Sequence, residues 1–278
     1  MLPNECKSEF CKVFNGINAK HHRYRVFSDF CMMAACSIQN AFLKSEEIEE
    51  RYLKVAANYS KDELIKFSTL FAITTLALEE PSDFLGSIFM ELGLGSSHTG
   101  QFFTPYVVSH AMAEMTFDEN SIATIKKNGF VTVSDPAIGA GSTIIAFTEV
   151  VKSRKLNPQE CVWVSGVDID PTAAAMAYIQ LSLLGIPGEI VVGNSLSMQF
   201  EYSYKTPMHY VGDWESRFRL SRMFNKIKGL FSSEISSGIR TEHEKEGVLE
   251  DNSSASRKDD ILFRDVSSFG ESIQLGLF

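Results

Sequence analysis

A chain of 278 residues, of which 44% are hydrophobic and 22% charged, is long enough to bury a core of ordinary size. Its net charge of −9 argues against a broad, non-specific grip on nucleic acid, because that grip depends on Lys and Arg neutralising phosphates. No apolar stretch predicts a membrane span, and charged residues interrupt the first 20 residues, so neither a membrane protein nor a secreted one is expected.

The five cysteines also bear on the compartment. An odd number without a secretion signal predicts reduced thiols in a cytoplasmic protein. Four of them form two pairs that flank a His-His dipeptide: Cys6 with Cys11, and Cys31 with Cys36. A zinc site is one interpretation, but a five-residue step places two thiols on different faces of a helix. Buried core thiols are therefore favoured, and no metal is expected.

Residues 1–95 are expected to form a helical N-terminal region. Residues 25–42 carry apolar side chains at helical spacing, without Pro or Gly. Ser60 followed by Glu63 predicts a capping box at the start of a long apolar helix. A shorter helix is expected over residues 83–92.

The pattern changes in residues 96–230, where β-rich runs alternate with helical stretches. The runs are 130–134, 162–167 and 190–192, and the helical stretches between them are 142–155 and 171–184. This alternation predicts parallel strands with crossover helices, which is a doubly wound α/β sheet. Residues 198–204 alternate between apolar and polar, as a half-buried strand does.

Polar residues and glycines follow each of the three predicted strands. Asp135 opens an Asp-Pro-Ala-Ile-Gly-Ala-Gly run after the first strand, Asp168 ends the second, and Asn194 follows the third. Ligands of open α/β sheets bind at the carboxyl ends of strands, so these residues predict one ligand site. A nicotinamide-binding protein would instead carry Gly-x-Gly-x-x-Gly directly after its first strand.

Four segments resemble the N6-adenine DNA methyltransferases, in particular the modification subunits of type I restriction–modification systems. They are the Phe-Thr-Pro segment in 100–108, the Asp-Pro-Ala-x-Gly-x-Gly loop of 135–141, and the segments 166–171 and 193–196. The last two resemble Gly-x-Glu-x-Asp-Pro and Gly-Asp-x-Leu, with an Asp in place of the Glu and an Asn in place of the Asp. The resemblance covers about residues 84–196.

The resemblance implies a Rossmann-like sheet of the S-adenosylmethionine-dependent methyltransferases, here truncated, that binds S-adenosyl-L-methionine. In the family, Asp168 would bond the ribose hydroxyls, Ile169 would pack on the adenine, and Asn194 would meet the adenine amino group. The residues implied to bind the cofactor are Phe103, Thr104, Pro105, Asp135, Ala137, Gly139, Gly141, Asp168, Ile169 and Asn194.

The family's catalytic tetrapeptide, Asn/Asp/Ser-Pro-Pro-Tyr/Phe after the fourth strand, does not occur in this sequence. In the family it accepts the amine hydrogens of a flipped adenine and stacks on the base. Thr206-Pro207 follows the fourth predicted strand and is the candidate motif, although an ordinary turn is the favoured interpretation. The chain is thus either an adenine-specific DNA methyltransferase, or a subunit of one, or an inactive relative that keeps the cofactor pocket.

A specificity or other partner subunit is expected, because no target-recognition domain fits into the rest of the chain. A basic helix is predicted over residues 214–231. Its Arg217, Arg219 and Arg222 are candidate contacts to a DNA backbone, although an amphipathic helix covering the sheet edge is favoured.

Residues 231–278 are expected to form a disordered acidic tail. Its last five residues resemble the Gln-Leu-x-Leu-Phe peptide with which bacterial polymerases and repair proteins bind the sliding clamp. The resemblance implies a clamp contact through Gln274, Leu275, Leu277 and Phe278. The alternative is that the end of the tail folds back onto the body of the protein.

Overall fold

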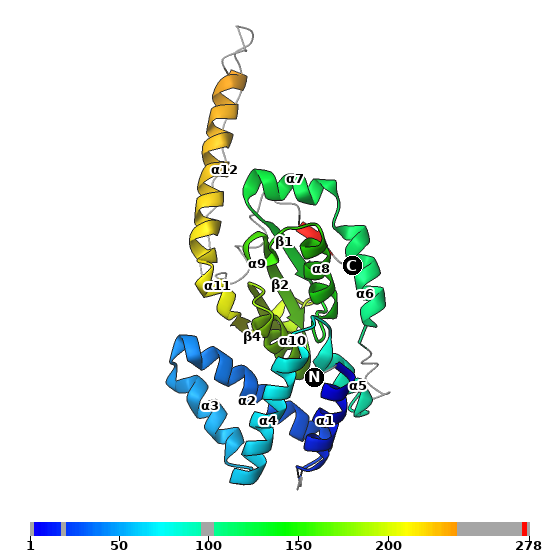
Figure 1. Ribbon diagram of the computed structural model, residues 1–278. Coiled ribbons are helices and arrows are strands. Elements are labelled where there is room, and N and C mark those ends of the chain that lie inside the picture. The colour runs from blue at the N-terminus through cyan, green and yellow to red at the C-terminus, as the bar shows by residue number, and fades with distance from the viewer. Residues whose placement is uncertain (1–2, 18–20, 96–102, 238–273, 277–278) are drawn as a thin grey trace. The chain divides into compact units, whose positions relative to one another are not determined.

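The computed structural model describes residues 3–17, 21–95, 103–237 and 274–276 (Figure 1). Residues 1–214 and 273–278 form one compact unit, and residues 215–272 form a second. The first unit contains the sheet and the helices that cover it.

The predicted helical N-terminal region consists, in its described part, of helices with short connections (Figure 1). Their bounds are α1 (Pro3–Asn15), α2 (Arg23–Leu43), α3 (Glu46–Ala56), α4 (Lys61–Ala77) and α5 (Phe84–Glu91). The capping box is confirmed: the Ser60 amide donates to a Glu63 carboxylate oxygen at 2.8 Å, and the Glu63 amide donates to the Ser60 hydroxyl at 3.4 Å.

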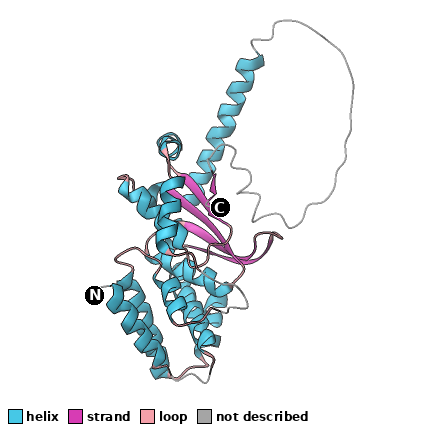
Figure 2. Cartoon of the chain, turned by 90° about the vertical axis from the view of Figure 1, so that its right-hand side faces the viewer, coloured by secondary structure: helices cyan, strands magenta, loops and turns pink. Residues whose placement is uncertain are grey.

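The sheet has the strand order β4-β3-β2-β1-β5. Figure 2 shows its strands, in magenta, beside the helices that pack against them. Its strands are β1 (Val131–Asp135), β2 (Val162–Asp168), β3 (Gly188–Asn194), β4 (Gln199–Lys205) and β5 (Gln274–Gly276). β5, β1, β2 and β3 run parallel, and β4 is antiparallel to β3. The prediction of a Rossmann-like α/β sheet after a helical region is confirmed.

The helices of this part of the chain are α6 (Tyr106–Thr116), α7 (Glu119–Asn128), α8 (Ser142–Ser153), α9 (Pro158–Cys161), α10 (Pro171–Leu183) and α11 (Pro207–Val211). α8 connects β1 to β2 and α10 connects β2 to β3, so both helices cover the same face of the sheet. On the other face the Trp163 indole N–H donates to Nδ1 of His209 in α11 at 3.1 Å.

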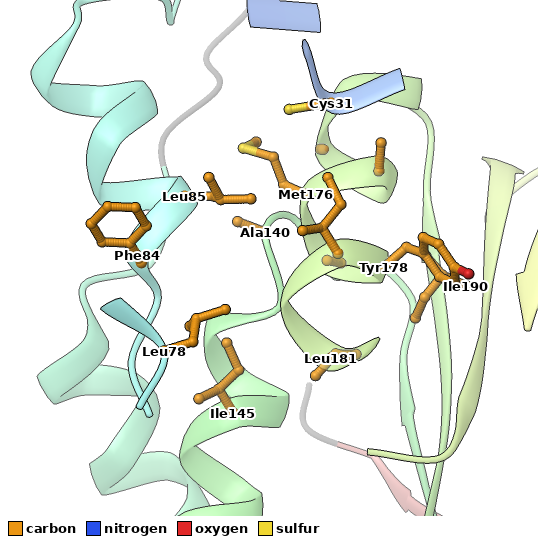
Figure 3. Packing of buried hydrophobic residues seen from close by; sticks show 14 of the residues in the cluster. Cys31, Leu78, Phe84, Leu85, Ala140, Ile145, Met176, Tyr178, Leu181 and Ile190 are labelled. Atoms are coloured by element: carbon orange, nitrogen blue, oxygen red, sulfur yellow. The ribbon is translucent and has the colours of Figure 1, made fainter. Parts of the chain in front are cut away.

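The core continues from the sheet into the helical region through α10. The side chains of Val131 and Val162 are buried beneath the crossover helices, and residues 172–181 are all buried. α10 contacts β2 and β3 on one side and α2 and α5 on the other, so Met176 and Leu85 lie in the same apolar cluster (Figure 3). The predicted boundary at residue 95 therefore does not divide the molecule, because the two parts share one core.

α2 corrects the expectation that no segment could cross a membrane. It is long and apolar enough to do so by length and composition, and it is the one such helix among the described residues. More than half of the apolar window is buried inside the protein, and core helices of soluble proteins pass the same test. Cys31 and Cys36 on this helix are buried and free, as is Cys6 on α1.

The acidic tail also differs from the expectation. Helix α12 (Trp214–Ser237) continues past residue 231, and Gln274–Gly276 forms β5 beside β1. A strand at the edge of a sheet leaves unpaired N–H and C=O groups, which a short extended segment can satisfy through its backbone alone. For Gln274–Gly276, the structure agrees with the alternative that the end of the tail folds back onto the body of the protein. The other residues of the tail lie outside the described part of the chain.

Candidate cofactor-binding site

The carboxyl ends of β1, β2 and β3 meet at one edge of the sheet. Their last residues are Asp135, Asp168 and Asn194. The parallel register sets Asp135 beside Gly166 and Asp168 beside Val192, so the three loops that follow are neighbours. This is the edge at which open α/β sheets bind their ligands.

Asp168 joins two of these loops. One carboxylate oxygen accepts a hydrogen bond from the Gly139 amide at 2.8 Å, and the other accepts one from the Asp170 amide at 2.9 Å. Burial raises the pKa of Asp168 above its usual value, and these backbone donors oppose that rise. Because the side chain is only partly buried and each oxygen keeps a lone pair, it can still accept hydrogen bonds from a ligand.

Asp135 has a different environment. It is 1% exposed, and its oxygens accept hydrogen bonds from the Ala137 amide at 3.0 Å and from the Thr143 hydroxyl. Burial raises the pKa of Asp135. In the structure this carboxylate holds the β1–α8 loop, and its implied contact with the cofactor stays a prediction.

The glycines let the β1–α8 loop take its path. Gly139 has a φ of +57° and Gly141 a φ of +94°, both in the region that favours glycine. A Cβ at Gly139 would lie 3.0 Å from the ring of Phe103. Phe103 also makes an edge contact with Phe89 of α5, with ring centroids 5.2 Å apart, so an aromatic pair from outside the sheet packs over this loop.

Thr104 and Pro105 lead into α6 directly after Phe103. The Pro105 carbonyl accepts hydrogen bonds from the amides of Val108 at 2.9 Å and Ser109 at 3.1 Å, which begins the helix. The Ser109 and Ser142 hydroxyls are 2.9 Å apart and join the start of α6 to the start of α8. The structure thus brings the Thr-Pro segment to the glycine loop, whereas residues 100–102 lie outside its described part.

Ile169 and Asn194 complete the predicted cofactor site. The Ile169 side chain is 68% exposed, which leaves an apolar surface beside Asp168. Asn194 Oδ1 accepts hydrogen bonds from the amides of Leu196 at 2.9 Å and Ser197 at 3.1 Å. Because both amides donate to that oxygen, the side-chain NH₂ is the group of Asn194 that can bind a ligand, whereas the sequence predicted a bond to the adenine amino group.

Thr206-Pro207, the candidate catalytic motif, lies at the opposite edge of the sheet from Asp135, Asp168 and Asn194. Because β4 runs antiparallel, its end at Lys205 pairs with Glu189 at the start of β3. The Thr206 hydroxyl accepts a hydrogen bond from the Gly188 amide at 3.0 Å and is 0% exposed. It therefore belongs to the opposite edge of the sheet.

The predicted DNA contacts lie on α12, which continues into the second compact unit. Arg219 and Arg222 are three residues apart and share a helix face, and the Arg219 guanidinium donates to the Ser216 hydroxyl at 2.9 Å. Arg217 lies elsewhere around the helix. Of the four predicted clamp contacts, Gln274 and Leu275 are in β5, and Leu277 and Phe278 lie outside the described residues.

Sequence reasoning missed two residues that hold the β1–α8 loop. Thr143 bonds Asp135, and the buried Gln180 bonds the carbonyl of Ala140 at 2.7 Å. A signal for Gln180 was present, because it is the one amide side chain in an otherwise apolar stretch of α10.

Residues 92–213 match the family model described as N-6 DNA Methylase. The matching segment runs from the end of α5 to the turn after α11 and contains β1, β2, β3 and β4. The match covers less than half of the 278 residues. No curated protein shows a significant match to the chain.

Two solved structures share a limited likeness with the chain. One, from Listeria monocytogenes, is described as a class I S-adenosylmethionine-dependent methyltransferase. It is 19% identical to this chain with a TM-score of 0.39, and the alignment covers 69% of this chain and 55% of that one. The other is a type I restriction-modification system methyltransferase subunit from Streptococcus thermophilus. It is 14% identical to this chain with a TM-score of 0.36, and the alignment covers 71% of this chain and 59% of that one. The chain spans little more than half the length of either protein, and such low TM-scores say nothing about its activity.

Proposed function

We propose that this chain binds S-adenosyl-L-methionine at the edge formed by β1, β2 and β3, and serves N6-adenine methylation of DNA. It acts as the methyltransferase or as a subunit of one, in the cytoplasm, within a restriction–modification or mobile-element system. The observation that carries this proposal is the joining of the β1 and β2 loops by Asp168, in a segment that matches the N-6 DNA methylase family model.

The described residues fit this cofactor. The loop backbone at Gly139 lies so close to the aromatic pair that a Cβ there would be 3.0 Å from the Phe103 ring. Asp168 offers free lone pairs to a ribose diol, Ile169 offers an apolar surface to a purine, and the Asn194 amide offers a donor to a purine ring nitrogen. When bound, the cofactor supplies an electrophilic methyl group on a positively charged sulfur.

The rest of the machinery must hold the adenine amine and accept its proton. The sequence contains no Pro-Pro dipeptide, and Thr206 is buried at the opposite edge. We therefore propose that a partner subunit, such as a specificity subunit, contributes to the adenine pocket and to target recognition. The position of Thr206 also favours a second candidate function, that of a DNA-associated regulatory protein that keeps the cofactor pocket without catalysis.

Transfer of a tritiated methyl group to unmethylated DNA distinguishes these functions. We expect incorporation into adenine by the chain together with the proteins that copurify with it. Asp168→Asn should abolish incorporation. The amides of Gly139 and Asp170 each donate to one carboxylate oxygen, and in the variant one of them would face an NH₂ group in place of an acceptor. Cofactor binding without incorporation would support the regulatory protein, and absence of cofactor binding would refute both functions.

DNA contact through α12 is a separate part of the proposal. Arg217, Arg219 and Arg222 lie within one and a half turns of the helix. If they neutralise phosphates, replacing all three by Gln should weaken DNA binding uniformly across sequences and reduce its dependence on salt. Unchanged salt dependence would leave α12 as a structural helix.

We also propose that the C-terminal peptide binds the bacterial sliding clamp. Residues 274–276 are extended and pair with Thr132, Val133 and Ser134 of β1, so clamp binding would require that they leave this edge. Capture of the clamp by the intact chain should be lost with Leu277→Ala and Phe278→Ala. Equal capture by both variants would refute the contact.

A further inference from the structure

The geometry points to Gln180 as a positioning residue that couples the helical N-terminal region to the cofactor-binding loop. This inference rests on the proposed function, because its consequence is a change in affinity for S-adenosylmethionine. Gln180 lies on α10, is 0% exposed, and is hydrogen-bonded to Asp83, Leu85 and Ala140.

The amide of Gln180 bonds to two separate parts of the molecule. One N–H donates to the carbonyl of Ala140 in the glycine loop, with nitrogen and oxygen 2.7 Å apart. The same nitrogen lies 3.0 Å from a carboxylate oxygen of Asp83, and the Gln180 oxygen accepts a hydrogen bond from the Leu85 amide at 2.9 Å. Both N–H donors are therefore used.

The partners of Gln180 determine what would follow its loss. Asp83 is the N-cap of α5, and the oxygen that Gln180 bonds also accepts a hydrogen bond from the Gly86 amide at 2.9 Å. Ala140 lies between Gly139 and Gly141, both at positive φ. Figure 3 shows Leu85 and Ala140 beside α10, in a cluster of buried apolar residues. An unbonded Ala140 carbonyl there would be costly, so the loop would shift.

α5 contributes a second contact to the same loop through Phe89 and Phe103, whose ring packs on Gly139. The helical region thus reaches the glycine loop by two routes, through the hydrogen-bonded amide of Gln180 on α10 and through the Phe89–Phe103 pair. Gly139 in turn donates to Asp168, so displacement of the loop would disturb the carboxylate that we propose binds the ribose.

The test compares Gln180→Leu, Gln180→Glu and the matched control Gln39→Leu. Gln39 is also a buried glutamine, 8% exposed, but its side-chain oxygen has no partner among the described residues. Calorimetry gives the affinity for S-adenosylmethionine, and hydrogen exchange of peptides covering residues 137–144 reports the loop without any cofactor.

Gln180→Leu removes all three of the side-chain hydrogen bonds of Gln180, of which the one to Ala140 holds the loop. We expect it to bind S-adenosylmethionine about tenfold more weakly, with faster exchange in the loop. Gln39→Leu should match the wild type. Gln180→Glu should be impaired at neutral pH, because its carboxylate faces the Ala140 carbonyl and Asp83. It should recover relative to the wild type as the pH falls, because a protonated Glu regains one donor.

This pH-dependent recovery separates positioning from a general loss of packing, which lowering the pH would not repair. If Gln180→Leu does not fold, Gln180→Glu decides the question. Wild-type affinity and wild-type exchange in a folded Gln180 variant, or no recovery of Gln180→Glu at low pH, would overturn the inference. If the wild type itself binds no cofactor, the proposed function fails, and loop exchange alone decides the role of Gln180.

Discussion

At the scale of single residues, the orientation of Asn194 sets which group of a purine it can recognise. The Leu196 and Ser197 amides occupy its oxygen, so the free side of the amide is a donor. An adenine ring nitrogen accepts hydrogen bonds, whereas its amino group donates them. If the proposed cofactor binds here, we therefore expect Asn194 to donate to its base, whereas an aspartate at this position, as in the resembled family, would accept.

Asn194→Asp tests this orientation. We expect about tenfold weaker binding of S-adenosylmethionine, because a carboxylate oxygen would replace the donor. Asn157→Asp is the matched control, because Asn157 caps α9 through a bond to the Gln159 amide at 3.1 Å, before β2 begins. Equal or tighter binding by Asn194→Asp in calorimetry would show that the position accepts a hydrogen bond.

Asp83 predicts a dependence of stability on pH. Burial raises the pKa of Asp83. Hydrogen bonds from Gln180 and Gly86 lower the pKa by a smaller amount, so it stays above its usual value. The stability that comes from a raised pKa is complete below the pKa of the unfolded chain and is lost as the pH rises through the folded value. Asp83→Asn, which stays neutral and can still accept, should therefore be more stable than the wild type at pH 7.

This advantage should shrink as the pH falls toward about 4, where carboxyl groups protonate. Urea unfolding at several pH values measures it. A difference that does not change with pH, or a wild type that is the more stable at pH 7, would contradict the raised pKa.

At the scale of elements, the sequence predicted where helices and strands form better than it predicted which strands pair with each other. The strands that become β1, β2 and β3, and the cap at Ser60, follow from patterns within a few residues. The segment that becomes β4 also alternates as expected, but alternation does not encode the neighbour with which a strand pairs. Because β4 is antiparallel to β3, Thr206 lies at the edge of the sheet opposite Asp135, Asp168 and Asn194. β5 is too short to have a pattern of its own.

The capping box of α4 gives a prediction for one element. Ser60→Ala removes the side-chain acceptor for the Glu63 amide and should lower the free energy of unfolding by about 1 kcal/mol. Ser68→Ala is the matched control on the exposed side of the same helix, where alanine favours the helix. Chemical denaturation of the three proteins measures the difference, and equal losses in both variants would contradict the capping role.

At the scale of the whole molecule, the helical region and the sheet form one unit in which the cofactor edge is held from outside. The Tyr24 hydroxyl of α2 lies 3.2 Å from that of Thr172, which donates to the Ser28 hydroxyl at 3.0 Å, at the start of α10. Local patterns predicted the helical region and the sheet but not their shared core, because a shared core depends on contacts between residues distant in the chain. The same reason explains why the sequence located Asp168 but missed Gln180.

The central claim is that Asp168 joins the loops of a cofactor-binding edge, and calorimetry with S-adenosylmethionine tests it most directly. We predict that the wild type binds the cofactor and that Asp168→Asn binds it at least about tenfold more weakly. Asp118→Asn should bind like the wild type, because Asp118 caps α7 through the Ser121 amide and asparagine also caps helices well. No binding by the wild type, or equal binding by Asp168→Asn, would contradict the claim.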